Sequence, residues 1–463
     1  MNSVAIIGGG ITGLTAAFRL KQRGVRVTVF EAGPRVGGVI QSVCSDGYLA
    51  EFGPNSILET SPRISELIRD LKLESRRMYS DPRAEKRFIV RGGKPVLVPG
   101  SPLDFLTADL FSWRAKAHLM AEPFISRSGA DEEESLEQFV LRRLGREFLD
   151  YAINPFVAGV YAGDPARLSV KHAFPKLHAL EQKYGSLIRG QFLGARARKK
   201  SGEVSKQSAK KISFDGGLQV LIDALANELA GNVQLQSPVQ ELEQTESGWR
   251  VHASGTAETF DAVLLAAPAH KLASFKISSH NPISLASFGD IKYPPVTSVV
   301  FGFRRSDVEH SLDGFGVLVP EVEKLNILGA IFSSSLFPHR APKDHVTVTV
   351  YLGGSRSPEL VNADRSTIRR LALKDLAKLL GTKGEPTFEH YTTFRQAIPQ
   401  YEIGYGRYKS MMDEIETQSP GLYFAGHYRD GISLSDSIVS GDGAASRIAG
   451  FVEKGSAQES LIV

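Results

Sequence analysis

VAIIGGGITG (residues 4–13) opens the chain, and an acidic residue, Glu31, follows at the end of a second apolar run. This order predicts a buried strand, a glycine turn, a helix and a second strand. In the G-x-G-x-x-G spacing, Gly8 permits the tight turn, Gly10 lets the backbone approach a pyrophosphate, and Gly13 lets the helix pack against the strand. The helix N-terminus then offers free N–H groups to the phosphates, and Glu31 lies where a ribose hydroxyl would bind. The stretch predicts a dinucleotide site; an ordinary βαβ turn is the alternative.

The segment directly after Glu31 indicates which dinucleotide binds. AGPRVGG (residues 32–38) places Arg35 just ahead of Gly37 and Gly38, which offers a cation for phosphate and two small residues where a bulky cofactor lies close. This pattern resembles the R-x-G-G signature that follows the Rossmann unit in the flavin-dependent amine oxidase and protoporphyrinogen oxidase superfamily. The resemblance implies FAD as the cofactor; a plain turn at the double glycine is the alternative.

Composition places the chain among soluble globular proteins. Its 463 residues suffice for roughly two or three domains, and they are 42% hydrophobic and 23% charged. The net charge of +4 is too small to indicate a nucleic-acid partner. Because Cys44 is the only cysteine, a disulfide framework and a cysteine-rich metal site are excluded, and we expect no metal. We see no signal peptide and no apolar run of the about 20 residues that span a bilayer, so we expect a cytoplasmic protein.

The distribution of strand and helix patterns predicts an α/β fold with three parts. We expect a Rossmann-type FAD-binding domain built from discontinuous segments, a mostly antiparallel-sheet substrate domain and a helical insert. The expected boundaries are 1–60, 212–268 and 396–463 for the FAD-binding domain, 61–95 and 269–395 for the substrate domain, and 96–211 for the insert. Residues 262–268 read as a buried strand that ends at a proline, Ser135–Gln138 as a capping box, and 154–165 as a glycine-punctuated loop.

Eight basic residues gather near the end of the insert, against one acidic residue, Glu203. They are Arg189, Arg196, Arg198, Lys199, Lys200, Lys206, Lys210 and Lys211. A solvated loop is the ordinary interpretation of such a run, and contact with an anionic lipid surface is the sharper one. Both stay open; the second predicts peripheral membrane contact, with the insert lying on a membrane without crossing it.

Longer stretches resemble the protoporphyrinogen oxidase family in particular. They are GVYAGDP (159–165), SSSLFPHRAP (333–342), IPQY (398–401) and the closing GISLSD (431–436). The resemblance covers almost the whole chain. Three positions depart from the family: His339 and His427 replace asparagines, and Phe394 replaces a tryptophan that members often have.

The resemblance implies a flavin site and a substrate site. No cysteine near the C-terminus is available as a tether, so we expect FAD to be bound non-covalently. The residues implied for the flavin are Gly8, Gly9, Gly10, Ile11, Thr12, Gly13, Glu31, Ala32, Arg35, Gly38, Val39, Gly53, Pro54, Asn55, Ser56, Val239, Phe394, Gly426, Ile432, Ser433 and Leu434. Arg87 would pair with a propionate of the substrate, and Gly159 would leave room for the ring. Leu318 and Phe337 would hold the macrocycle from its two faces. A solvated Arg87, and plain core roles for the other side chains, are the alternatives.

The resemblance also implies the reaction. Members of the family oxidise protoporphyrinogen IX to protoporphyrin IX, a six-electron dehydrogenation in heme biosynthesis, with O2 as acceptor and H2O2 as product. The flavin N5 carries the chemistry, so we expect no catalytic side chain, and the chain positions the substrate in a dry cavity. Coproporphyrinogen III oxidation to coproporphyrin III is the main alternative; another amine oxidase-type enzyme and a non-catalytic FAD-binding scaffold are further ones. We expect a porphyrinogen and O2 as partners, product handover to a downstream chelatase, and a monomer or homodimer.

Overall fold

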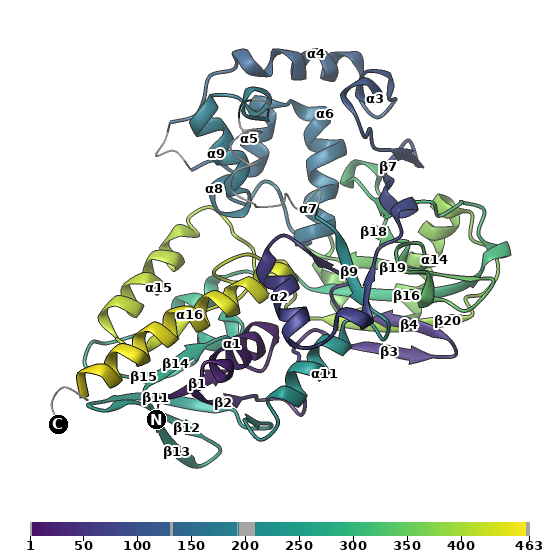
Figure 1. Ribbon diagram of the computed structural model, residues 1–463. Coiled ribbons are helices and arrows are strands. Elements are labelled where there is room, and N and C mark those ends of the chain that lie inside the picture. The colour runs from purple at the N-terminus through teal and green to yellow at the C-terminus, as the bar shows by residue number, and fades with distance from the viewer. Residues whose placement is uncertain (1, 130–132, 192, 194–208, 460–463) are drawn as a thin grey trace.

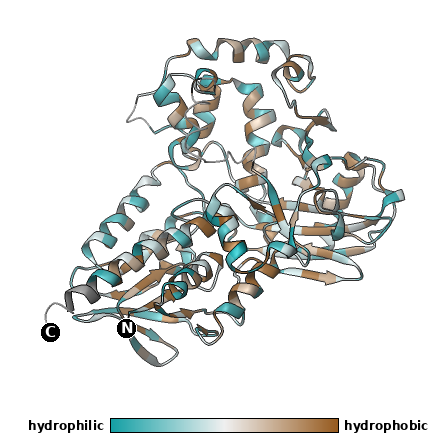
Figure 2. Ribbon diagram, viewed as in Figure 1, coloured by the Kyte–Doolittle hydropathy of each residue, from teal (hydrophilic) through white to brown (hydrophobic). Residues whose placement is uncertain are grey.

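The structure is a computed structural model that describes residues 2–129, 133–191, 193 and 209–459. Within these ranges the chain forms two bodies, each built around a large sheet, and a helical assembly stands above them (Figure 1). In Figure 2 the strands of both large sheets are mostly brown, whereas the outward-facing helix α15 (Gly406–Gln418) carries much teal. The apolar residues are therefore concentrated in the sheets, which form the cores.

Five parallel strands form the sheet that the opening motif predicts. In order across the sheet they are β10 (Val233–Gln234), β2 (Arg26–Phe30), β1 (Ser3–Ile7), β14 (Ala262–Leu265) and β21 (Leu422–Phe424). All residues of β1 and β14 are buried, as expected of central strands that are covered on both faces, so the buried strand ahead of Pro268 is confirmed. Because the strands come from distant parts of the chain, a Rossmann-type fold built from discontinuous segments is confirmed as well.

Different elements cover the two faces of this sheet. Val4 and Ile6 pack against α1 (Ile11–Gln22), α2 (Pro62–Asp70), α11 (Gln219–Glu228) and α16 (Leu434–Glu459). Ala5 and Ile7 face the opposite core, which contains the fully buried Trp249. That core is covered by a four-stranded sheet of β13 (Thr256–Phe260), β12 (Gly248–Ala253), β11 (Val239–Thr245) and β15 (Lys276–Ser278). The period-2 alternation along β1 thus assigns each side chain to one of two cores.

A seven-stranded sheet forms the second body. Its order is β20 (Phe388–Phe394), β16 (Val296–Arg304), β19 (His345–Gly353), β18 (Ile327–Ile331), β17 (Gly316–Leu318), β7 (Arg87–Arg91) and β8 (Lys94–Leu97). Every pairing is antiparallel except that of β17 with β7, so the mostly antiparallel sheet is confirmed. α14 (Arg365–Leu380) covers one face with Ile368, Ala372 and Leu376.

The helical assembly at the top of Figure 1 comes from the segment between β8 and β9. Its helices are α3 (Pro102–Thr107), α4 (Trp113–Ala121), α5 (Leu136–Arg143), α6 (Arg146–Phe148), α7 (Asn154–Tyr161), α8 (Val170–Ala173) and α9 (Pro175–Tyr184). The capping box at the start of α5 is confirmed, because Ser135 Oγ accepts from Gln138 N at 3.1 Å and Gln138 Oε1 accepts from Ser135 N at 2.9 Å.

The expected loop over 154–165 is wrong, because most of it is helix α7. Pro155 lies in the first turn of α7, which continues directly from a π-helical turn over Leu149–Ile153. Val157 and Tyr161 are buried on the side of the helix that faces the insert core. Tertiary packing thus overrides the low helix propensity of the internal glycine, and the helix ends at Ala162, whose φ is 50°.

Shorter elements complete the fold: β3 (Ser42–Ser45), β4 (Tyr48–Glu51), β5 (Ile57–Leu58), β6 (Arg77–Tyr79), β9 (Lys211–Phe214), α12 (Ala269–Leu272) and α13 (Ser333–Leu336). In the described part of the chain, no helix combines the length and apolarity needed to span a membrane. Several members of the basic run lie outside the described residues: Arg196, Arg198, Lys199, Lys200, Lys206 and their acidic neighbour Glu203. The domain boundaries given above stay a prediction.

Candidate cofactor and substrate site

The glycine turn between β1 and α1 leaves open space in front of the helix. A Cβ on Gly8, whose φ is +113°, would lie 2.9 Å from Ala267 N, and one on Gly13 would lie 2.0 Å from Gly8 O. A Cβ on Gly10 would meet nothing within 4 Å. The helix also begins at Gly10 without a side-chain cap. Its first amides therefore have no side-chain acceptor, which suits the oxygens of a pyrophosphate.

Glu31 joins the glycine turn to the segment that follows β2. Its Oε2 accepts a hydrogen bond from Gly9 N at 2.8 Å, and its Oε1 accepts one from Gly33 N at 2.7 Å. A side chain on Gly9 would collide with this carboxylate, because a Cβ there would lie 2.9 Å from Oε2. Glu31 is half-buried, and Ala32 beside it is exposed. The carboxylate is thus held beside the turn, where a ribose is expected.

Arg35 folds the R-x-G-G segment back on itself. Its Nη1 donates to Val36 O at 3.0 Å and to Ile40 O at 3.1 Å, and its Nη2 donates to Gly38 O at 2.7 Å. Gly38 has a φ of +58°, a conformation that glycine adopts without strain. Arg35 therefore stabilises the turn itself, a role that the sequence pattern did not indicate. Contact between this guanidinium and a phosphate stays a prediction.

The turn over residues 53–56 lies against the end of the R-x-G-G segment. A Cβ on Gly53 would lie 2.8 Å from Val39 O, and the Val39 side chain is 52% exposed. Asn55 in this turn is held by Arg340, whose Nη2 donates to Asn55 O at 2.7 Å and whose Nη1 donates to Asn55 Oδ1 at 3.3 Å. The turn therefore has a fixed backbone beside an exposed apolar residue.

Arg340 and Glu51 form a buried ion pair behind this turn, and the sequence patterns did not point to it. The distance from Nη2 to Oε1 is 3.1 Å. Ser42 Oγ and Leu218 N also donate to Glu51, at 2.6 and 3.0 Å. Burial raises the pKa of Glu51, and the charge of Arg340 opposes this shift. The one available signal was the arginine within the motif at residues 333–342.

The closing loop brings the start of α16 to the start of α1. Gly426 begins this loop with a φ of +128°. Ser433 Oγ accepts from Asp436 N at 3.1 Å and Asp436 Oδ2 accepts from Ser433 N at 3.2 Å, which fixes the beginning of α16. Thr12 Oγ1 donates to Ser437 O at 3.2 Å. The other residues implied for the flavin are Ile432 and Leu434 in and after this loop, Val239 at the start of β11 and Phe394 at the end of β20.

His427 lies directly after Gly426, at a position where the resemblance described above implies an asparagine. Its Nε2 is buried and has no hydrogen-bond partner among the described residues. Burial, and then the neighbouring His270, lowers the pKa of His427 to about 4, so the imidazole is neutral at pH 7. Its ring stands edge-on to that of Tyr293, with the centroids 5.8 Å apart. A hydrogen bond to a ligand would satisfy this nitrogen.

Three of the four residues implied for the substrate lie near one another. Gly159 on α7 faces Leu318 on β17, since a Cβ on the glycine would lie 2.4 Å from Leu318 Cδ2. β17 pairs in parallel with β7, where Leu318 lies opposite Ile89 and Gly316 lies opposite Arg87. Arg87 itself is exposed. An exposed cation and an apolar side chain therefore belong to the same pair of strands.

Phe337 belongs to a different apolar cluster from Leu318. It is 0% exposed and packs in a small cluster with Ala84 and Leu336. The guanidinium of Arg340 lies 4.6 Å from its ring centroid. Full burial is what a core role predicts, and contact between this ring and a substrate stays a prediction.

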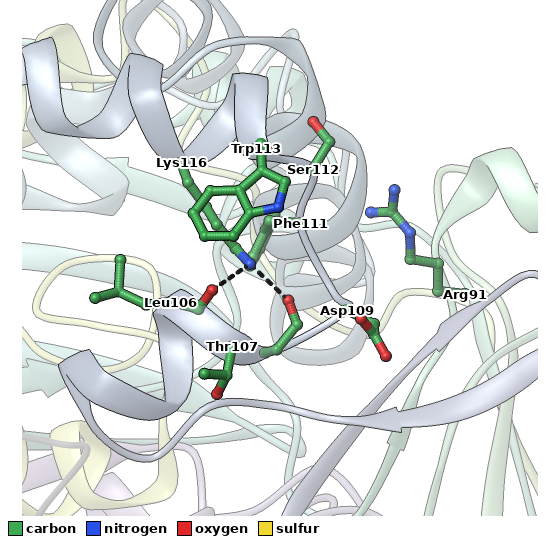
Figure 3. A pocket seen from close by; sticks show the side chains of 9 residues that line it. Arg91, Leu106, Thr107, Asp109, Phe111, Ser112, Trp113 and Lys116 are labelled. Atoms are coloured by element: carbon green, nitrogen blue, oxygen red, sulfur yellow. Dashed lines mark hydrogen bonds between the residues drawn. The ribbon is translucent and has the colours of Figure 1, made fainter.

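A pocket of about 490 Å³ lies in the insert, beside α3 and α4 (Figure 3). Lys116 Nζ donates to Leu106 O and Ala108 O, both at 2.8 Å, beneath the ring of Trp113. The lysine charge is therefore directed at the carbonyls that end α3. No residue predicted for the flavin or the substrate lines this pocket.

Comparison with known proteins shows the family. The flavin containing amine oxidoreductase family matches residues 11–449. Protoporphyrinogen oxidase 2 of Arabidopsis thaliana is 36% identical over 97% of this chain and 94% of its own length. Coproporphyrinogen III oxidase of Bacillus subtilis is 30% identical over 96% of this chain and 97% of its own length. A crystal structure of a protein from Exiguobacterium sp. 255-15 has a TM-score of 0.80 at 24% identity, with 96% of this chain and 98% of that chain covered, and shows the fold alone. The chain belongs to the flavin containing amine oxidoreductase family.

Proposed function

We propose that this oxidoreductase binds FAD non-covalently and oxidises protoporphyrinogen IX to protoporphyrin IX, with O2 as the acceptor. The assignment of the substrate rests on the 36% identity, over 97% of the chain, with a plant protein named protoporphyrinogen oxidase 2. The open and uncapped turn at Gly10 supports the cofactor. The contact of Gly159 with Leu318, on the strand that pairs with that of Arg87, supports a site for an apolar ring with an acidic side chain.

The protein's own task in this reaction is to bind and orient. Bound FAD would supply the acceptor for the electron pairs that leave the porphyrinogen. The amides after Gly10 would hold the pyrophosphate, and Glu31 would hold a ribose hydroxyl. Arg87 would pair with a propionate of the substrate by a charge-assisted hydrogen bond. Leu318, next to Gly159, would lie against the macrocycle and exclude water from it.

Oxidation of coproporphyrinogen III is the second candidate. It is favoured by the 30% identity with a Bacillus subtilis protein named for that substrate, over 96% of this chain. Parallel assays separate the two: porphyrin fluorescence, O2 uptake and H2O2 release are followed with each porphyrinogen. We expect the higher kcat/KM with protoporphyrinogen IX. A preference for coproporphyrinogen III would reverse the assignment, turnover of amines alone would indicate an amine oxidase-type enzyme, and a yellow but inert protein would indicate a non-catalytic scaffold.

The attachment of the cofactor is tested separately. Cys44 is the only cysteine and is exposed on β3, far in sequence from the C-terminal loop. Acid precipitation of the holoprotein should therefore leave the yellow chromophore in the supernatant, with the absorbance of FAD. Colour that stays with the precipitated protein would show a covalent bond and contradict the proposal.

We also propose that the insert rests on a membrane surface, as part of a cytoplasmic enzyme. Large apolar side chains are exposed on and beside α3 and α4, at the end of the molecule opposite the five-stranded sheet (Figure 1). They are Leu103 (77% exposed), Trp113 (74%), Met120 (67%) and Phe124 (83%). Apolar patches of this kind on a soluble protein mark surfaces that bind something. The same surface would serve handover of the product to a chelatase.

Flotation with liposomes tests the membrane proposal. The protein should float with anionic vesicles, and the double variant Trp113→Ser/Phe124→Ser should float less. Val322→Ser, which changes a side chain that is 47% exposed outside the insert, is the matched control and should behave like the natural protein. Equal flotation of all three proteins, or none by any, would contradict the proposal. Light scattering of the protein in the absence of vesicles decides between a monomer and a homodimer.

A further inference from the structure

Two cations from distant segments, Lys211 and Arg87, both lie close to the chain around Phe315 and Gly316. Lys211 begins β9 and Arg87 begins β7. The Nζ of Lys211 lies 5.8 Å from the centroid of the Phe315 ring. The backbone N–H of Phe315 in turn donates to the carbonyl of Lys86, directly before Arg87, at 2.7 Å. Phe315 thus contacts the side chain of Lys211 with its ring and the strand of Arg87 with its backbone.

Neither of these two residues forms an ion pair in the described structure. Neighbouring cations are paired: Lys86 with Asp313, and Arg77 with Glu59 at 3.2 Å. In the described ranges, neither Arg87 nor Lys211 has an ion pair or a side-chain hydrogen bond. Two like charges near each other repel, so an anion between them would be bound favourably.

The surroundings of Lys211 support this picture. Its side chain is half-buried. Burial, and then the charge of Arg87, lowers the pKa of Lys211, and Glu85 opposes the shift. A cation that is partly desolvated and repelled by a neighbouring like charge is more typical of a binding site than of a solvated surface.

Apolar residues adjoin the two cations on both sides. Phe315 packs against the cluster that contains Phe337. Arg87 and Ile89 occupy alternate positions of β7, and Ile89 belongs to the same cluster as Leu318, so Arg87 lies on the face of the sheet that carries Leu318. The two cations therefore lie at the edge of an apolar surface. Such a surface is complementary to a flat apolar ring that carries carboxylates.

We infer that Lys211 and Arg87 together bind the carboxylates of the porphyrinogen, and that Lys211 determines preference for substrates with two neighbouring carboxylates. The inference rests on the proposed function. Each cation would donate to one carboxylate, and the repulsion between them would be relieved when both are engaged. Lys211 is thus a specificity residue outside the motifs that indicated Arg87.

Substitution of Lys211 tests the inference on the FAD-loaded protein. Lys211→Met keeps the length of the side chain and removes the charge, whereas Lys211→Arg keeps the charge. Lys210→Met is the matched control, because the Nζ of Lys210 lies over a different ring, that of Tyr79, at 5.1 Å. The measurements are KM and kcat with protoporphyrinogen IX, and the Kd of protoporphyrin IX and of its dimethyl ester by fluorescence.

We expect Lys211→Met to raise KM and the Kd of protoporphyrin IX about tenfold, the effect of losing one charge-assisted hydrogen bond, with kcat nearly unchanged. Lys211→Arg and Lys210→Met should resemble the natural protein, and the dimethyl ester should bind the natural protein and Lys211→Met equally.

An unchanged Kd of protoporphyrin IX in Lys211→Met, or an equal loss of affinity in Lys210→Met, overturns the inference, while turnover by the natural protein upholds the proposed function. If the natural protein neither binds nor oxidises a porphyrin compound, the proposed function itself has failed. Lys211→Gln replaces Lys211→Met if the latter does not retain FAD.

Discussion

Arg340 and Glu51 are joined by an ion pair of 3.1 Å although both side chains are only 1% exposed and the residues are 289 positions apart. Arg340 also donates to Asn55 O at 2.7 Å and covers the ring of Phe337 at 4.6 Å. One buried cation therefore holds the turn implied for the flavin and the motif implied for the substrate in a fixed relation. A residue at this junction would position both predicted sites.

The first prediction concerns this ion pair. Arg340→Met leaves the carboxylate of Glu51 buried and unpaired, so we expect the free energy of unfolding to fall by about 3–5 kcal/mol. The double variant Glu51→Met/Arg340→Met removes both charges and should recover most of this loss. Urea unfolding, with FAD absorbance as a second readout, checks both. Stability of Arg340→Met within about 1 kcal/mol of the natural protein would mean that the pair contributes as little as a surface ion pair.

The second prediction separates two glycines of the same turn. A Cβ on Gly13 would lie 2.0 Å from Gly8 O, whereas one on Gly10 would meet nothing within 4 Å. Gly13→Val should therefore disrupt the packing of α1 on β1, with loss of both stability and FAD. Gly10→Ala should fold with nearly natural stability and yet bind FAD weakly, because its methyl group occupies the space expected for the pyrophosphate. Thermal unfolding and flavin titration measure the two effects, and full FAD occupancy in Gly10→Ala would show that the cofactor lies elsewhere.

The strand–turn–helix unit was predictable because its signals are local. Residues 4–13 contain the apolar run, the glycine spacing and the helix start in consecutive positions, and the capping box at Ser135 is equally local. The helix over 154–161 was missed because a glycine inside a helix is unfavourable by propensity, whereas the packing of Val157 and Tyr161 that stabilises this helix is tertiary. The pair of Arg340 with Glu51 was missed for a related reason. The two residues are 289 positions apart, and no local sequence pattern indicates that they contact each other.

The same distinction applies to the candidate site. The resemblance implied one site for Gly159, Leu318, Arg87 and Phe337, and the packing of α7 on β17 brings the first three near one another. Exposure is a property of tertiary packing, and no local pattern shows that Phe337 is fully buried. Lys211 escaped notice because it ends a basic run, where a solvated role is the ordinary expectation.

The third prediction uses the contact between Gly159 and Leu318. Gly159→Ala brings a methyl group to 2.4 Å from Leu318 Cδ2, so the leucine side chain must move. Because this atom is the end of a flexible side chain, we expect a loss of stability of only about 1 kcal/mol, together with a clearly lower kcat/KM for the porphyrinogen. Gly159→Ala/Leu318→Ala relieves the collision and should restore α7 without restoring the contact with the substrate. An unchanged kcat/KM in Gly159→Ala would place this contact outside the substrate site.

The last prediction concerns the pH dependence of stability. The pKa of His427 is lowered to about 4 from an ordinary value near 6.5, by burial and then by His270. Between these two values the unfolded chain takes up a proton that the folded chain excludes, so stability falls as the pH drops from about 6.5 to 4 and is constant, for this group, above 6.5. A shift of this size corresponds to a loss of about 3 kcal/mol over the window.

His427→Asn removes the titrating group and should flatten this part of the profile, while other histidines with lowered pKa values keep the remainder. Urea unfolding at intervals from pH 4 to 7 measures the slope, and His280→Asn, a change at an exposed histidine, is the control. If His427→Asn and the natural protein lose stability in parallel, His427 is protonated as readily in the folded chain as in the unfolded one. The Nε2 atom of His427 would then not be a buried nitrogen without a partner. The argument that this atom forms a hydrogen bond with the cofactor would lose its physical basis.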